Sequence, residues 1–196
     1  MLRRQALLKI SAVCAALALS GCTPSTPTFQ NTDITGADFG KNFTLTDHTG
    51  KTRSLSDYQG KVVLIFFGFT QCPDVCPTTL AELSEVMKKL GSGADRVQVL
   101  FITVDPERDT QTVLGQYVPA FDPRFVGLTG SVEQIAAVAK DFKAFYQKVP
   151  TPNGSYTVDH FSGMYAFDAT GRIRLFIRYR APMDSVVADV KTLLKG

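Results

Sequence analysis

An uncharged apolar run over residues 62–67 leads directly into two cysteines and the start of a helical pattern. The run is rich in β-branched and aromatic side chains, which is typical of a strand buried on both faces of a sheet. Pro77 suits the first turn of a helix, and apolar residues then recur at helical spacing as far as Gly91. We therefore expect a buried central strand, a loop that carries the cysteines, and a helix that begins beside them.

The rest of the chain extends this unit into an α/β pattern. Two hairpins, two single strands and three helices are expected from the spacing of apolar and turn-forming residues. In chain order they are a hairpin over 43–55, a strand over 97–104, a helix over 109–120, a strand over 125–128, a helix over 131–143, a hairpin over 164–179 and a helix over 184–194. This is the element order of a thioredoxin-like fold with an N-terminal β-hairpin and an inserted helix and strand.

The start of the chain has the pattern of an export signal. Arg3, Arg4 and Lys9 flank the start of an uncharged apolar run over residues 10–19. A helix that crosses a bilayer needs roughly 20 apolar residues. We therefore expect a cleaved signal peptide over residues 1–21 and not a permanent membrane span.

Small residues, Ser20 and Gly21, stand immediately before Cys22. This arrangement resembles a bacterial lipobox, in which the cysteine is lipidated and the chain is cleaved ahead of it. The alternative is an ordinary signal peptide in which Cys22 is incidental. Lipidation of Cys22 would anchor the protein to a membrane, with its domain in the periplasm or on the extracytoplasmic face. The sequence leaves open whether that membrane is the inner or the outer one.

The mature chain divides into a short tether and one domain. Residues 22–36 are rich in Thr, Pro and Ser and predict a flexible tether, and residues 37–196 suffice for a single core. Loss of the signal removes three of the 21 basic residues and none of the 18 acidic ones, so the mature chain has no net formal charge. Because it also lacks a basic block, we expect no binding to nucleic acid.

Two thiols remain after processing. Of the four cysteines, Cys14 leaves with the signal and Cys22 carries the lipid, so Cys72 and Cys76 are the free thiols in an oxidising compartment. Their position at a helix start predicts a lowered pKa for at least one of them. A separation of four positions places both sulfurs on one helical face, where they can form a disulfide or bind one ion.

The mature chain has two histidines. His48 lies in a predicted hairpin turn and is interpreted as an exposed polar residue. His160 precedes the strand that runs beside the cysteine loop in thioredoxin-like folds, and its spacing fits a structural histidine or a metal ligand equally well. Two thiolates and an imidazole would suit copper, whereas zinc usually takes a fourth ligand, for which the sequence offers no obvious residue.

Three motifs together, at 72–77, 105–110 and 158–160, resemble the SCO/SenC family of copper chaperones, and the similarity extends over residues 39–194. The resemblance implies that Cys72, Cys76 and His160 bind Cu(I) or Cu(II), and that the two cysteines form a redox-active disulfide. It also implies a role in assembling the dinuclear copper centre of cytochrome c oxidase, by delivering copper or by reducing cysteines. The implied partners are the copper-bearing subunit of the oxidase and an upstream copper donor.

Three aspartates match acidic positions of the family pattern. Asp74, Asp105 and Asp159 are predicted to orient the histidine or to contact a partner. The alternatives are that Asp74 favours the helix start, that Asp105 shapes a turn, and that Asp159 is a solvated loop residue. Residues 145–154 have the composition of a loop able to close over the site and contact a partner.

A copper-binding assembly factor, and not a turnover enzyme, is therefore the leading hypothesis. The alternative is a thiol-disulfide oxidoreductase that acts through Cys72 and Cys76 alone. Residues 159–162 contain no proline, whereas thioredoxin-type reductases place one opposite their cysteines, and this difference favours metal binding. A peroxidase is a weaker alternative, because only Thr70 echoes its motif. Both main hypotheses need the thiols, but only the first needs His160.

Overall fold

The computed structural model describes residues 27–196. One large sheet contains eight strands in the order β1-β10-β9-β4-β5-β6-β2-β3, and β7 and β8 form a separate pair. The strands are β1 (Thr32–Asp33), β2 (Thr44–Asp47), β3 (Thr52–Ser54), β4 (Val62–Gly68), β5 (Val97–Thr103), β6 (Val126–Thr129), β7 (Tyr146–Pro150), β8 (Tyr156–His160), β9 (Met164–Phe167) and β10 (Ile173–Ile177). The helices are α2 (Val75–Leu90), α3 (Gln111–Tyr117), α4 (Val132–Asp141) and α5 (Met183–Leu193), with short 3₁₀ turns η2 (Leu55–Tyr58) and η3 (Gly91–Arg96).

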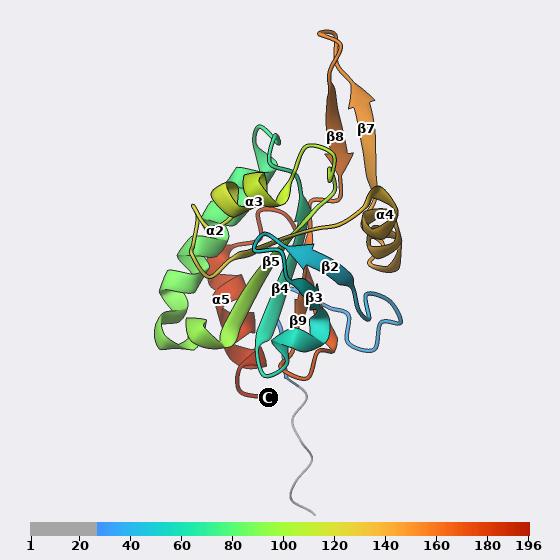
Figure 1. Ribbon diagram of the computed structural model, residues 1–196. Helices are drawn as coiled ribbons and strands as arrows, with labels where there is room; N and C mark the ends of the chain where they lie inside the picture. The colour runs from blue at the N-terminus through green and yellow to red at the C-terminus, as the bar shows by residue number, and fades with distance from the viewer. Residues whose placement is uncertain (1–26) are drawn as a thin grey trace, which may run out of the picture.

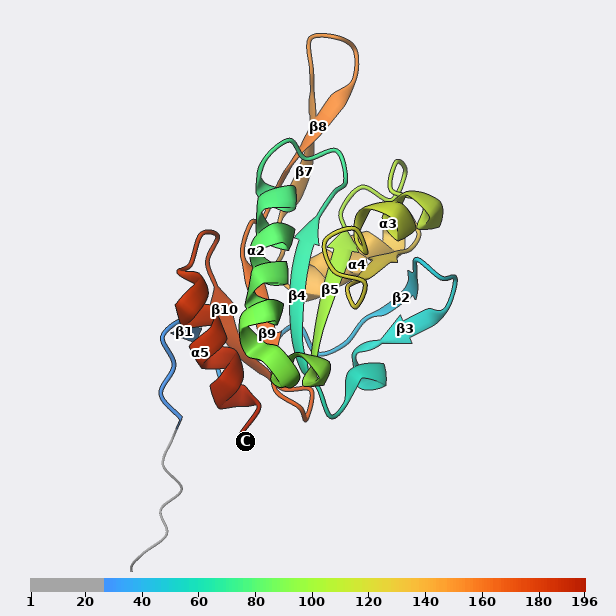
Figure 2. The same cartoon turned by 90° about the vertical axis from the view of Figure 1, so that its left-hand side faces the viewer.

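The helices cover both faces of the sheet. Helices α2 and α5 lie side by side on one face, and α4 lies on the other (Figures 1 and 2). The central strands β4 and β5 run parallel, and every residue of both is buried. Their β-branched and aromatic side chains therefore form the middle of the core, as expected for strands covered on both faces.

The thioredoxin-like arrangement predicted from the sequence is confirmed. Strands β4, β5 and β6 are parallel, β9 and β10 add an antiparallel hairpin, and α3 with β6 forms the inserted helix and strand. The N-terminal hairpin is β2 with β3. The capping box predicted at Ser131 and Gln134 is present at the start of α4.

Two predictions of irregular structure were wrong. Residues 27–36, part of the expected tether over 22–36, pack against the domain, because β1 pairs with β10 and the Asp189 carboxylate accepts backbone N–H groups of Gln30 and Asn31. The stretch 145–154, expected as a loop, instead supplies β7 of a hairpin that projects from one end of the molecule (Figure 1). The expected signal over 1–21, the lipidation site Cys22 and the tether up to residue 26 lie outside the described residues.

None of the helices within residues 27–196 has both the length and the apolar character to span a membrane.

Candidate metal centre

The two thiols occupy different positions at the start of α2. Strand β4 ends at Gly68, a loop carries Cys72, and the helix begins at Val75, so Cys76 lies inside its first turn. Cys76 is fully buried, whereas Cys72 is partly exposed. Both are free thiols, and the backbone N–H of Cys76 donates to the Cys72 sulfur over 3.4 Å.

These positions separate the acidities of the two thiols. The pKa of Cys72 falls to about 4, because the Cys76 thiol hydrogen-bonds to its sulfur and backbone N–H groups of Asp74 and Cys76 stabilise the anion. The pKa of Cys76 is raised, because its proton is held by the Cys72 thiolate and because the side chain is buried. At neutral pH the pair is therefore one thiolate and one thiol.

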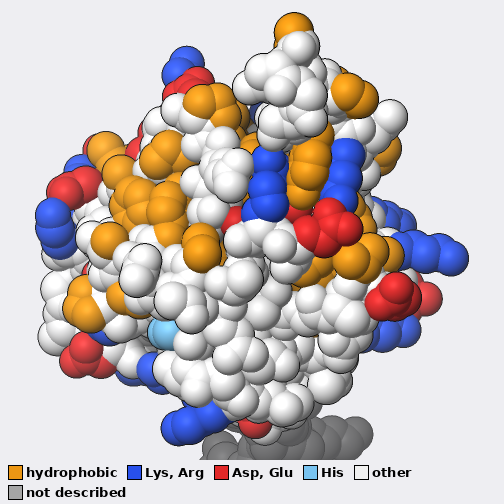
Figure 3. Space-filling view, turned by 45° about the horizontal axis from the view of Figure 1, so that its top comes forward, with side chains coloured by type: hydrophobic (Ala, Val, Ile, Leu, Met, Phe, Trp, Pro, Cys, Tyr) orange, Lys and Arg blue, Asp and Glu red, His pale blue; other side chains and the backbone are white. Residues whose placement is uncertain are grey.

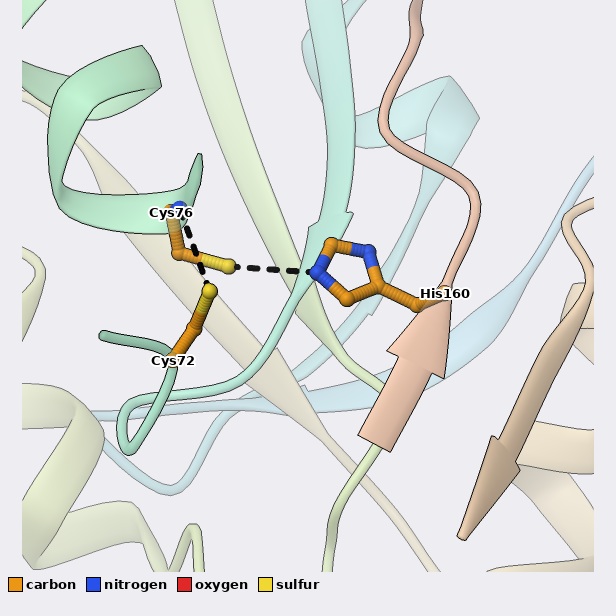
Figure 4. A group of neighbouring side chains, drawn as sticks. All are labelled: Cys72, Cys76 and His160. Atoms are coloured by element: carbon orange, nitrogen blue, oxygen red, sulfur yellow. Dashed lines mark hydrogen bonds between the residues drawn. The ribbon is translucent and has the colours of Figure 1, made fainter. Parts of the chain in front are cut away.

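His160, the last residue of β8, faces the two sulfurs (Figure 4). Its Nδ1 lies 2.8 Å from the Phe161 carbonyl oxygen, which can only accept a hydrogen bond, so Nδ1 carries the proton. The lone pair of the neutral ring then lies on Nε2, 3.5 Å from the Cys76 sulfur. The Phe66 and Phe69 rings pack against the imidazole in edge-to-face arrangements. The histidine is thus prepared to act as a ligand through Nε2.

The three side chains form a group of metal-ligating atoms. The sulfurs of Cys72 and Cys76 and a ring nitrogen of His160 all lie within 4.8 Å of one another. Within residues 27–196, no carboxylate or second histidine joins this group. His48 lies elsewhere, half-buried in its hairpin turn, where its Nδ1 accepts the Gly127 N–H. Two soft sulfurs and one imidazole fit copper, and a tetrahedral zinc site would lack one protein ligand.

The three predicted aspartates lie around the site and not among its donor atoms. Asp74 is exposed at the N-terminus of α2, and Asp159 is exposed in β8 opposite Gln147. Asp105 is fully buried after β5. The Nδ1 of His160 is paired with the Phe161 carbonyl, so none of these three carboxylates hydrogen-bonds to the ring at Nδ1. Contact with a partner stays a prediction for all three.

The segment that follows β5 contains site residues to which the sequence assigned no role. Arg108 contacts the cysteine loop through Gln71 and the hairpin through Tyr156. Asp109, fully buried, accepts the N–H and the hydroxyl of Thr70, and burial raises its pKa. Basic and acidic side chains gather where the hairpin meets the body (Figure 3). Their position directly after a buried strand is the sequence signal that could have identified these charged residues.

A family model and a curated relative both match this chain. The family model described as SCO1/SenC matches residues 31–195. The mitochondrial SCO2 homolog of Bos taurus is 45% identical over 133 residues, which are 66% of this chain and 50% of that protein, so the chain spans half the length of this relative.

Solved structures of similar proteins share the fold. ScoI of Bradyrhizobium japonicum, solved with copper bound, is 43% identical with a TM-score of 0.74, over 80% of this chain and 99% of that one. BsSco is described as a member of the Sco family of cytochrome c oxidase assembly proteins, with a disulfide switch. It is 29% identical with a TM-score of 0.66, over 84% of this chain and 98% of that one.

Proposed function

This chain belongs to the SCO1/SenC family, and from that premise we propose that it binds copper and assists assembly of the dinuclear copper centre of a cytochrome c oxidase. The observation that carries the proposal is the convergence of Cys72, Cys76 and His160, whose donor atoms lie within 4.8 Å of one another. The copper-bound ScoI structure and the described role of BsSco support it. Copper is here the cargo of the protein and not a resident cofactor.

The donor set suits a cargo that must be both held and released. Cys72 is already a thiolate at neutral pH, and His160 presents the Nε2 lone pair. Cys76 must lose its proton before its sulfur can act as a full ligand, since the thiolate and not the thiol binds metal. Binding therefore releases a proton, and protonation of Cys76 favours release of the metal.

Reduction of a partner's disulfide is a second candidate function, and the lowered pKa of Cys72 favours it. The Cys72 thiolate would attack one sulfur of the partner's disulfide and displace the other as a thiolate, leaving a mixed disulfide. Cys76 would give up its proton and attack the Cys72 sulfur, which completes release of the reduced partner. The pair of cysteines ends oxidised and the partner ends with two thiols. This step needs no histidine.

We further propose that Cys22 is lipidated and anchors the domain to the extracytoplasmic face of a membrane. The first described residue, Pro27, lies near the C-terminal Gly196, at the opposite end of the molecule from the β7–β8 hairpin (Figures 1 and 2). An anchor there would direct the candidate site away from its own attachment point. The copper-bearing subunit of the oxidase and an upstream copper donor are the proposed partners.

The test is metal analysis and absorption spectroscopy of residues 27–196, with His160→Ala, Cys72→Ala and Cys76→Ala as variants. We expect one copper per chain and a sulfur-to-copper charge-transfer band that either cysteine variant abolishes. We also expect His160→Ala to weaken binding. Unchanged copper binding by His160→Ala would overturn the ligand set. Thiol-reductase activity in a wild-type chain that binds no copper would favour the second function.

A further inference from the structure

The ligands of the candidate site come from two parts of the fold that share no strand pairing. Cys72 and Cys76 follow β4 of the large sheet, whereas His160 ends β8 of the separate two-stranded sheet. Residues 161–163 tie His160 to β9, which fixes one side of the base of the hairpin. The rest of the β7–β8 hairpin projects from the body (Figure 2). The distance between the imidazole and the sulfurs therefore depends on what braces the hairpin.

Val158 of the hairpin packs into the core, and the polar bracing comes from one short segment. Apart from the contacts of His160 itself, every hydrogen bond between residues 146–160 and the rest of the described chain goes to Asp105, Glu107 or Arg108. The Tyr156 hydroxyl donates to Asp105 Oδ1 over 2.8 Å and lies 3.4 Å from Glu107. Lys148 forms an ion pair with Glu107. This segment lies directly after the central strand β5.

Arg108 joins the two halves of the site. Its Nη1 donates to the Gln71 side chain over 3.0 Å and to the Tyr156 carbonyl over 2.9 Å. Gln71 is next to Cys72 in the cysteine loop, and Tyr156 begins the strand that ends at His160. The guanidinium also stacks over the Tyr156 ring, with 3.8 Å from Cζ to the ring centroid. One side chain thus contacts both ligand-bearing segments.

Arg108 is itself held in place. Its Nε donates to Asp105, which is fully buried, and only 18% of the Arg108 side chain is exposed. A planar guanidinium can satisfy these acceptors at fixed angles while it stacks on an aromatic ring. A lysine ammonium keeps the charge but cannot reproduce the planar array of N–H donors. The contact therefore depends on the shape of arginine and not on its charge alone.

We propose that Arg108 is a positioning residue that braces the β7–β8 hairpin against the cysteine loop and so holds His160 at ligand distance from the two sulfurs. This inference rests on the proposed function, because the distance matters only if the three side chains bind one ion. Removing a group that orients a metal ligand typically costs about 10–100-fold in metal affinity. Arg108 would act on the affinity through His160, without touching the metal.

The test compares Arg108→Lys with the matched control Arg124→Lys in the purified chain. Arg124 also pairs with an aspartate, Asp122, and lies outside the site. The measurements are Cu(II) affinity, the electron paramagnetic resonance spectrum of bound Cu(II), and amide hydrogen exchange of the metal-free chain. A second variant, Tyr156→Phe, removes the hydroxyl bond to Asp105 but keeps the stacked ring.

For Arg108→Lys we expect an affinity loss of about 10–100-fold. The sulfur-to-copper band should persist while the nitrogen coupling of His160 weakens. In a His160→Ala background the same substitution should change the affinity by less than about twofold, because both substitutions remove the same interaction of His160 with the metal. The metal-free chain should show about tenfold faster exchange of the β8 amides, with no change in Arg124→Lys. Tyr156→Phe should shift the same readouts in the same direction.

Wild-type affinity in Arg108→Lys, or an equal loss with and without His160, would overturn the positioning role. So would unchanged exchange of the β8 amides in the metal-free variant, a measurement that stands whether or not copper binds. Failure of the wild-type chain to bind copper would instead overturn the proposed function. Hydrogen exchange would then decide by itself whether Arg108 braces the hairpin.

Discussion

The two thiols of the site differ because of where α2 begins. Cys76 lies inside the first turn, where its thiol donates to the Cys72 sulfur and is fully buried, so its charged form is disfavoured. Cys72 precedes the helix and receives hydrogen bonds from the groups around it, so its charged form is favoured. A spacing of four positions thus produces one nucleophilic sulfur and one protected sulfur from two identical side chains.

Alkylation should reveal this difference. Above about pH 4 the Cys72 thiol is deprotonated, so iodoacetamide should modify it at a rate that changes little from pH 6 to 8. Cys76 should react about a hundredfold more slowly, because it is buried and protonated. Cys76→Ala should move the inflection in the alkylation rate of Cys72 to higher pH, because it removes the main hydrogen bond that stabilises the Cys72 thiolate. Cys76→Ser is the control, because its hydroxyl keeps a hydrogen-bond donor. Peptide mass mapping gives both rates, and equal rates would contradict this assignment.

Gly68 leaves the space into which Cys76 packs. A Cβ at this position would lie 2.7 Å from the Cys76 sulfur and 2.8 Å from a ring carbon of Phe101. We expect Gly68→Ala to cost about 1–3 kcal/mol in the free energy of unfolding and to weaken copper binding. Gly93→Ala, where the nearest atom is 3.5 Å away on Leu194, is the control. Denaturant unfolding measures both, and an unchanged midpoint in Gly68→Ala would refute the close contact.

The site residues that could be predicted are those whose signals lie close together in the sequence. Cys72 and Cys76 could be predicted because the expected processing would account for the other two thiols and because a buried strand and a helix start flank the pair. His160 depended on the family resemblance, since one histidine has no spacing of its own. The role of Arg108 could not be predicted, because its partners Gln71 and Tyr156 lie 37 and 48 positions away and only the fold brings them together.

At the scale of elements, the same turn occurs twice. The hairpins β2–β3 and β9–β10 each turn through Asp-x-Thr-Gly followed by a basic residue, at 47–51 and 168–172. In each, the aspartate accepts from the threonine N–H and hydroxyl and from the N–H four positions on, and pairs with an arginine six positions on. Gly50 and Gly171 have positive φ, which the turn requires.

These turns should make stability depend on acid pH. Burial disfavours the charged form of Asp168, but hydrogen bonds from Thr170, Arg172 and Arg174 outweigh it, so its pKa is lowered. A lowered folded-state pKa gives stability that is present above the ordinary value near 4 and is lost as pH falls below it. Asp168→Asn should therefore unfold about 1–3 kcal/mol more easily at pH 7, with a smaller difference near pH 3.

Urea unfolding at both pH values provides the measurement. The control is Asp95→Asn, because the Asp95 side chain is 84% exposed and its nearest cation is 3.9 Å away. A deficit in Asp168→Asn that is as large at pH 3 as at pH 7 would show that the charge of this carboxylate contributes nothing.

The hairpin β7–β8 was missed for a physical reason. Strands buried in a sheet show apolar runs or alternation, but the residues of β7 are exposed or only partly buried. Its turn contains Pro152 and Gly154, which also suit a loop. Strand pairing here depends on the partner strand and on the bracing by residues 105–108, and neither leaves a periodic pattern in the sequence.

At the scale of the whole molecule, the domain begins earlier than its composition indicates. The stretch before residue 37 is rich in Thr, Pro and Ser and poor in large apolar residues, so a tether was expected there. In the structure, β1 extends the sheet at β10, and Asp189 of α5 accepts three hydrogen bonds from Gln30 and Asn31, each 2.8 Å long. Backbone and polar contacts, which hydropathy does not detect, hold this segment against the domain together with Phe29 and Ile34, which pack against the core.

A chain that begins at residue 37 should consequently be less stable than one that begins at residue 27. Loss of the β1 pairing and of the Asp189 bonds should cost about 2 kcal/mol and lower the melting temperature by about 4–8 °C.

Asp189→Ala should destabilise the longer chain by a similar amount, because it leaves the Gln30 and Asn31 N–H groups without their acceptor. In the shorter chain the same substitution should have little effect, since the two changes remove one set of contacts. Asp184→Ala, on the same helix but with a side chain 86% exposed, is the control. The measurement is calorimetry of the long and short chains, each with and without Asp189→Ala, and of the control. Equal melting temperatures for the long and short chains would show that residues 27–36 belong to the tether.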